Sequence, residues 1–173
     1  MKPIYLLGMP SSGKSTLGRG LARVLECPFV DMDKRIEARE GLSIPELFAL
    51  RGEEYFRKVE SAVLKSLPTT ELQVVSTGGG VPCFFDNLDF IKANGLSIFL
   101  DVPLTVLVER LLRSRKDDRP LYRQKDPTEL AATLETTYAN RLPIYRQADL
   151  IVSGETTVEQ LLEALKYLGV DSR

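Results

Sequence analysis

The chain contains no histidine. Without an imidazole it can form neither a Ser-His-Asp nor a Cys-His nucleophilic site, and it can offer no histidine ligand to a metal. Any acid–base chemistry must therefore use Asp, Glu, Lys or Tyr. This absence removes several large classes of hydrolase from consideration.

Cysteine is scarce as well. The chain has 2 cysteines, Cys27 and Cys83, and no C-x-x-C pair. Two scattered thiols make neither a disulfide framework nor a zinc site. We expect both to act as small buried hydrophobic residues.

Long apolar runs and an excess of positive charge are also missing. No run approaches the roughly 18 apolar residues of a membrane helix, and the run at residues 4–7 is too short for a signal peptide. We therefore expect a cytoplasmic protein with no membrane partner. The net charge of -1 and pI of about 5.7 argue against a general nucleic-acid binder but allow a local basic pocket.

The 173 residues form a single predicted domain, residues 1–173, in which short apolar strands alternate with amphipathic helices. This alternation is typical of an α/β fold with a parallel sheet covered on both faces. Strands are expected at 4–7, 29–31, 72–76, 96–100 and 150–152. Helices are expected from residue 14, at 33–40, 43–50, 53–67, 86–93 and 103–112, after 126, and at 158–168. The charged segment 113–126 is either a solvated loop or a mobile lid.

The stretch GMPSSGKS at residues 8–15 fits the pattern G-x-x-x-x-G-K-[ST]. An apolar strand precedes it and a helix begins at Lys14, which is the context that a phosphate-binding loop requires. Its backbone N–H groups and the helix N-terminus would hold phosphates. The expected nucleotide-binding residues are Ser11, Ser12, Gly13, Lys14, Ser15 and Thr16. An ordinary Gly-Pro-Ser turn is the alternative, and the strand–loop–helix context argues against it.

A nucleotide site of this kind is compatible with ATPases, GTPases and small-molecule kinases. The guanine-reading pattern Asn-Lys-x-Asp is absent. A short chain with a charged segment is more typical of a kinase that acts on a small molecule.

Asp31 and Asp33 follow the second predicted strand, at the edge where open α/β sheets bind ligands. If both lie on the strand, alternate residues share a face and both carboxylates point into one cleft. One would help to hold Mg²⁺ and the other would accept a proton or hydrogen bond from a substrate hydroxyl. The alternative is that Asp33 only caps a helix beginning at Lys34. Beside the phosphate loop we favour the functional interpretation.

The segment TGGG at residues 77–80 follows the third predicted strand. Its glycines offer freedom in φ and uncovered backbone N–H groups. A tight turn is the alternative, but one glycine usually suffices for that. We expect a ligand to approach this backbone closely.

Three arginines are candidates for anion binding. Arg57 and Glu60 share a helix face, so Arg57 can bind a carboxylate while Glu60 orients it. A solvated surface ion pair is the alternative, and without further support the residues favour it. Arg141 has the same ambiguity, and Arg119 could stabilise a phosphoryl group in transfer.

Taken in order, GMPSSGKST, DMD, FRKVE, TGGG, DRPL and NRLPIY followed by AD resemble the shikimate kinases. The resemblance covers nearly the whole chain. It implies a three-layer P-loop kinase fold like that of the nucleoside monophosphate kinases, with a five-stranded parallel sheet, a substrate-binding helical region at about 33–61 and a lid at about 113–126. It implies transfer of phosphate from ATP to the 3-hydroxyl of shikimate, giving shikimate 3-phosphate and ADP on the route to chorismate and the aromatic amino acids.

The resemblance also implies a role for each matching residue on the nucleotide side. Lys14 and Ser15 match the ligands of phosphate and Mg²⁺, and Asp31 matches the carboxylate near the metal. Arg119 matches the lid arginine, and Arg113 is expected to contact adenine. The strand that ends at Ser76 lacks the aspartate of a usual second nucleotide motif, and the family uses the carboxylate on the second strand instead.

On the acceptor side, Asp33 matches the residue that holds the shikimate hydroxyls and acts as base. The other matching residues bind the shikimate carboxylate, contact the ring hydroxyls or line the pocket: Arg57, Arg141, Glu60, Gly78, Gly79, Gly80, Phe48 and Phe56. We expect Lys14, Asp33 and Arg119 to be catalytic.

Two alternatives remain at this stage. One is another small-molecule kinase of the same fold, such as a gluconate or nucleotide kinase. The other is a nucleotide-binding protein without catalysis. The combination of TGGG, Arg57 and Arg141 favours shikimate as the substrate, and we expect a monomer.

Overall fold

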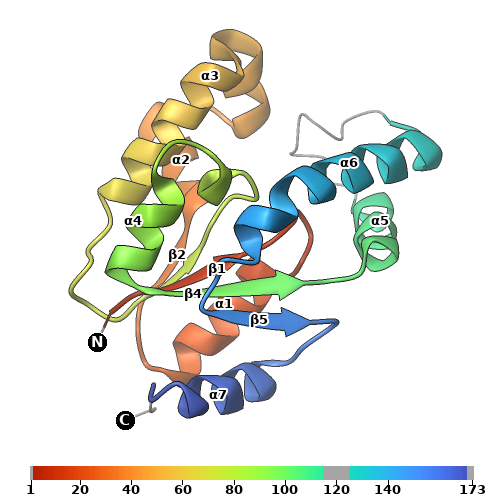
Figure 1. The fold of residues 1–173 in the computed structure, drawn as a ribbon. Helices are drawn as coiled ribbons and strands as arrows, with labels where there is room; N and C mark the ends of the chain where they lie inside the picture. Colours follow the sequence, from red (N-terminus) through yellow and green to blue (C-terminus); the bar gives the residue numbers. More distant parts are fainter. Residues whose placement is uncertain (1, 115–124, 171–173) are drawn as a thin grey trace.

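The computed structural model describes residues 2–114 and 125–170 (Figure 1). Five parallel strands form one sheet in the order β2-β3-β1-β4-β5. The strands are β1 Ile4–Leu7, β2 Phe29–Asp31, β3 Val74–Ser76, β4 Leu96–Asp101 and β5 Leu150–Ser153. The register pairs Leu6 of β1 with Ser76 and Ile98, so the loops that follow neighbouring strands emerge at one edge. That edge carries the candidate site.

Helices cover both faces of the sheet, which makes three layers (Figure 1). They are α1 Lys14–Val24, α2 Met32–Glu40, α3 Ile44–Lys65, α4 Asn87–Asn94, α5 Leu104–Arg113, α6 Pro127–Tyr145 and α7 Val158–Tyr167, with the 3₁₀ turn η1 Val81–Cys83 before α4. Successive side chains of β1 point to opposite faces of the sheet, so the strand contributes to a hydrophobic core on each face. Ile4 and Leu6 pack with residues of α1 and α7, whereas Tyr5 and Leu7 pack with residues of α3, α4 and α6.

The predicted strands and helices match the observed ones closely, and the expected parallel five-stranded sheet is confirmed. Residues 43–50 and 53–67 are joined into α3 across Gly52, whose φ of 80° and ψ of 169° break the helix. The capping box at Ser43 and Glu46 opens this helix as expected. Cys27 and Cys83 are free thiols that are only partly buried.

Most of the predicted lid at 113–126, including Arg119, lies outside the described residues. Within residues 2–114 and 125–170, no helix combines the length and the apolar character needed to cross a membrane.

Candidate functional site

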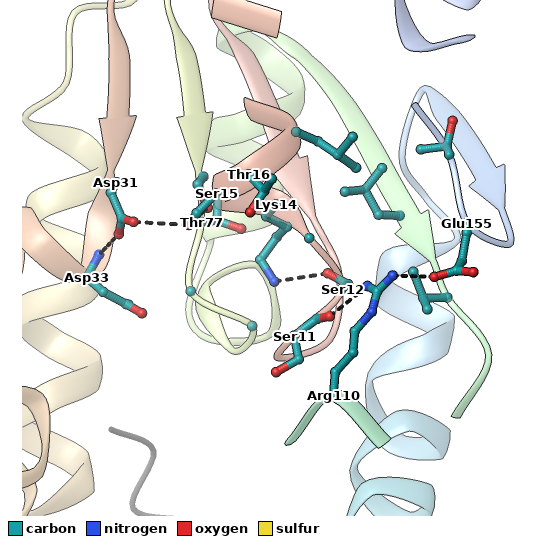
Figure 2. Close-up of a pocket in the computed structure, with 18 of the residues that line it drawn as sticks. Ser11, Ser12, Lys14, Ser15, Thr16, Asp31, Asp33, Thr77, Arg110 and Glu155 are labelled. Carbon is teal, nitrogen blue, oxygen red and sulfur yellow. Dashed lines mark hydrogen bonds and ion pairs between the residues drawn. The ribbon is translucent and has the colours of Figure 1, made fainter. Parts of the chain in front are cut away.

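A pocket of about 450 Å³ opens at the carboxyl edge of the sheet (Figure 2). The loop after β1, the start of α1 and the segment after β3 form its walls, together with residues from β4, α5 and the loop before α7. Ten of the predicted site residues line it: Ser11, Ser12, Gly13, Lys14, Ser15, Thr16, Asp31, Asp33, Gly78 and Gly79. Residues predicted to bind the nucleotide and residues predicted to bind the acceptor therefore line one pocket.

The loop between β1 and α1 is shaped by its two glycines. Gly8 has φ of 145°, and a Cβ there would lie 2.8 Å from the Leu100 carbonyl oxygen. Gly13, with φ of 96°, directly precedes the first turn of α1. The N-terminus of α1 thus opens onto the pocket, where its unpaired N–H groups and the helix dipole favour an anion.

Lys14 extends its buried side chain across this loop. Its Nζ donates hydrogen bonds to the carbonyl oxygens of Gly8 at 2.9 Å and Met9 at 2.8 Å, and to Ser12 Oγ at 3.3 Å. A positive charge is therefore fixed inside the curl of the loop, beside the helix N-terminus. This arrangement suits phosphate groups that carry more than one negative charge.

Three side chains with oxygen atoms that can bind a metal ion lie together in the wall of the pocket. Ser15 Oγ donates to Asp31 Oδ2 at 3.0 Å and lies 3.1 Å from Ser76 Oγ. One carboxylate and two hydroxyls fit Mg²⁺, which prefers oxygen ligands and is commonly completed by substrate phosphates. Sequence analysis missed Ser76, because it noted only that this strand lacks the usual aspartate and gave the role of metal ligand to Asp31 instead. Among the described residues, no cluster of three or more His, Cys, Asp or Glu side chains offers a separate metal site.

The prediction that Asp31 and Asp33 share a strand face is wrong. β2 ends at Asp31 and α2 begins at Met32, so Asp33 lies in the first turn of a helix. The Asp31 Oδ1 accepts from the backbone N–H groups of Asp33 at 3.1 Å and Lys34 at 3.4 Å. Asp31 is therefore the capping residue, and the alternative in which Asp33 caps the helix is also wrong. Both carboxylates still line the pocket (Figure 2).

Arg57 and Glu60 form a buried ion pair beside this pocket. The Arg57 Nη1 donates to Glu60 Oε2 at 2.7 Å, and the two residues are 5% and 2% exposed. The alternative of a solvated surface pair is therefore wrong. Burial raises the pKa of Glu60 to about 7, although the positive charge of Arg57 opposes this shift. Arg141 of α6 is also buried, and its positive charge likewise opposes the rise in the pKa of Glu60.

The glycines of the segment at 77–80 make room for these side chains. None of the three has the positive φ that favours glycine, so the prediction that they supply freedom in φ is wrong. What matters is the missing Cβ, because the space that such an atom would need is already occupied. It would lie 2.8 Å from Glu60 Oε1 at Gly78, 2.9 Å from Arg141 Nη1 at Gly79 and 2.8 Å from Arg57 Cζ at Gly80.

The remaining predicted acceptor residues do not line the pocket. They are Arg57, Glu60, Arg141, Gly80, Phe48 and Phe56. Phe48 and Phe56 pack against each other, with ring centres 4.6 Å apart. The segment after β3 lies between the loop that follows β1 and this cluster, because Gly79 is next to Gly8 and Pro10 on one side and Arg141 on the other.

Arg113, predicted to contact adenine, does not line the pocket. Its side chain is 79% exposed and pairs with Glu109. Arg110, one turn earlier in α5, lines the pocket instead and donates to the Ser11 carbonyl oxygen at 3.0 Å and to Glu155 at 2.6 Å (Figure 2). Sequence analysis missed Arg110 and Glu155. The only sequence signal for Arg110 was its position one turn before Arg113, and no sequence signal pointed to Glu155.

Comparison with known proteins finds the same family by sequence and by fold. The family model described as "Shikimate kinase" matches residues 10–168. The shikimate kinase of Aquifex aeolicus is 42% identical over 162 residues, covering 94% of this chain and 92% of that protein. The shikimate kinase structure from Bacteroides thetaiotaomicron superposes with a TM-score of 0.87 at 36% identity, covering 96% of this chain and 97% of that one. A structure of the Acinetobacter baumannii enzyme in complex with shikimate has a TM-score of 0.89 at 31% identity, covering 99% and 96%.

Proposed function

The chain belongs to the shikimate kinase family and is an ATP-dependent enzyme of that activity, and we propose how its own residues carry out the reaction. The γ-phosphoryl group of ATP passes to the 3-hydroxyl of shikimate, giving shikimate 3-phosphate and ADP. The reaction belongs to the biosynthesis of chorismate and the aromatic amino acids. One observation carries the assignment of roles: the segment at 77–80 contacts a phosphate-type loop on one side and a buried cluster of arginines on the other.

On the nucleotide side, Lys14 and the N–H groups of residues 11–16 neutralise and orient the phosphates of ATP. This assignment is supported by the ammonium of Lys14, which lies within the loop next to the helix N-terminus. Phosphoryl transfer depends mainly on alignment and charge neutralisation, so a rigid cradle of this kind is what the reaction needs. Arg119, from the predicted lid, would add positive charge at the transferred group.

Ser15 and Asp31 are the proposed ligands of Mg²⁺, with Ser76 as a further oxygen beside them. When bound, the ion supplies charge neutralisation at the β- and γ-phosphate oxygens. The hydrogen bonds among these side chains hold the donors in place, and the capping bonds to Asp31 Oδ1 fix its carboxylate.

On the acceptor side, Asp33 accepts the proton of the attacking hydroxyl, and Arg57 and Arg141 bind the carboxylate of shikimate. The two arginines suit this role because a guanidinium can bind a carboxylate through two parallel hydrogen bonds. Glu60 keeps Arg57 oriented through the 2.7 Å bond to Nη1. Bound in this way, shikimate presents one hydroxyl toward the phosphate loop. It also occupies the position from which a water molecule could otherwise accept the phosphoryl group.

We further propose that the enzyme acts as a monomer in the cytoplasm, without a nucleic-acid or membrane partner. The near-neutral net charge supports the absence of a nucleic-acid partner.

The direct test is ³¹P NMR of a mixture of the chain, ATP, Mg²⁺ and shikimate. We expect the γ-phosphate signal of ATP to be replaced by one phosphate-ester signal coupled to the ring proton at carbon 3. Release of inorganic phosphate alone, or phosphorylation at another hydroxyl, would contradict the proposed placement of the acceptor.

A further inference from the structure

Phe84 lies against the guanidinium of Arg57. The Arg57 Cζ is 4.3 Å from the centre of the Phe84 ring, closer than its 5.3 Å from the neighbouring Phe56 ring. Phe84 comes directly after η1, in a different part of the chain from α3. A positively charged group at this distance from the face of an aromatic ring is attracted by the negative potential of that face.

The hydrogen bonds of Arg57 are made by its N–H groups. Glu60 accepts from Nη1 at 2.7 Å, and Glu53 accepts from Nε at 3.3 Å and Nη2 at 3.0 Å. The faces of a guanidinium have no N–H group, so an aromatic ring can cover one without using a donor. Arg57 therefore keeps donors for a carboxylate ligand although its side chain is only 6% exposed.

The segment that carries Phe84 is fastened to the same helix as Arg57. The Ser61 hydroxyl donates to Asn87 Oδ1 at 2.7 Å, and the Asn87 amide donates to the Val81 carbonyl oxygen at 2.8 Å. One turn further along α3, Lys65 pairs with Asp86 at 2.5 Å. These contacts fix residues 81–87 against the part of α3 that follows Arg57.

The backbone next to Phe84 is also unusual. Phe85 has φ of 52°, in the left-handed region that a bulky residue rarely adopts, and its side chain is 61% exposed. The two adjacent aromatic residues thus have different surroundings, one against Arg57 and the other in solvent. Strain of this kind persists only where surrounding contacts enforce it.

We propose that Phe84 is a positioning residue for Arg57 and thereby a determinant of specificity for acceptors that carry a carboxylate. The proposal rests on the proposed function, in which Arg57 binds the shikimate carboxylate. Without the ring, Arg57 loses its restraint on one face, and the half-exposed carboxylate of Glu53 remains to draw it away from the acceptor.

The test compares Phe84→Leu with Phe85→Leu, an adjacent and matched change in a ring exposed to solvent. Each protein is assayed with shikimate and with shikimate methyl ester, which lacks the negative charge. For Phe84→Leu we expect the ratio of kcat/KM for the acid to that for the ester to fall about three- to tenfold, mainly through a higher KM for shikimate. The KM for ATP should stay unchanged, and Phe85→Leu should keep the wild-type ratio.

A Phe84→Leu protein that loses activity equally toward acid and ester, or loses none, would overturn the proposal. If Phe84→Leu does not fold, a fluorinated phenylalanine at position 84 keeps the shape of the ring but weakens its negative face. An unchanged ratio in that protein overturns the proposal, and a lowered one supports it. A wild-type chain that phosphorylates neither acceptor would instead overturn the proposed function, and the inference with it.

Discussion

At the scale of single residues, Asp33 is the side chain on which turnover should depend most. It lines the pocket in the first turn of α2, and its proposed role is to accept the proton of the acceptor hydroxyl. We expect Asp33→Asn to lower kcat by about 100-fold or more, the range typical of a lost general base, with the KM for ATP nearly unchanged. Steady-state kinetics with each substrate varied in turn measures both quantities.

Glu54→Gln is a suitable control for this change, because the Glu54 side chain is 83% exposed on α3, where it pairs with Lys58. It should keep wild-type kinetics. If Asp33→Asn weakened ATP binding as much as turnover, Asp33 would belong to the nucleotide side instead.

Glu60 should make stability depend on pH. Burial raises its pKa from 4.5 to about 7, so between these values the folded chain holds a proton that the unfolded chain has lost. The stabilising contribution of this bound proton is complete below about pH 4.5 and disappears as the pH rises through about 7. From pH 5.5 to 8, the wild type should therefore lose free energy of unfolding relative to Glu60→Gln, by at most about 1.4 kcal/mol per pH unit.

Urea unfolding at several pH values measures this difference. A wild type that instead gains stability relative to Glu60→Gln as the pH rises would mean that Arg57 keeps the carboxylate ionised throughout.

The sequence could predict many site residues by type but not all of their surroundings. Spacing placed Arg57 and Glu60 on one helix face, yet it could not reveal that other elements bury both. Asp31 and Asp33 were assigned to one strand because a three-residue strand and a helical first turn look alike in so short a stretch. The contact of Phe84 with Arg57 depends on folding, and no local pattern records it.

At the scale of elements, α3 is two helical stretches joined at Gly52. Its φ of 80° and ψ of 169° lie in a region that essentially only glycine adopts. Gly52→Ala should lower the free energy of unfolding by about 2–3 kcal/mol. Gly41, with φ of 68° and ψ of 17°, ends α2 in the milder left-handed helical region, so Gly41→Ala should cost about 1 kcal/mol.

Both glycines have no atom within 4 Å of a hypothetical Cβ, so packing does not distinguish them. Denaturant unfolding of the two variants compares their backbones directly. Equal losses would contradict the assignment of special strain to Gly52.

The segment after β3 is the second element with a sharp expectation. A Cβ at position 80 would lie 2.8 Å from Arg57 Cζ, so Gly80→Ala must displace the guanidinium. We expect the KM for shikimate to rise at least about tenfold, as expected for the loss of a charge-assisted hydrogen bond. The dissociation constant for ATP, measured by calorimetry, should change little. A larger effect on ATP than on shikimate would contradict this role for the segment.

At the scale of the whole molecule, the order of strands was beyond the reach of periodicity. The apolar runs indicated which residues form strands, and their alternation with helices indicated parallel pairing. Nothing within one run indicates its neighbours, so the order β2-β3-β1-β4-β5 appears only in the folded chain. That order brings β1, β2 and β3 side by side, and with them Ser15, Asp31 and Ser76.

The most direct measurement is coupled release of ADP from ATP and Mg²⁺, with shikimate, gluconate and nucleoside monophosphates offered as separate acceptors. Rapid turnover is expected with shikimate alone, because the chain belongs to the shikimate kinase family and the segment at 77–80 lies between the phosphate loop and the arginines proposed to bind the shikimate carboxylate. Rapid turnover with another acceptor would agree with the role of the phosphate loop but contradict the roles given to Asp33, Arg57 and Arg141. Tight ATP binding without turnover on any acceptor would contradict the catalytic function itself.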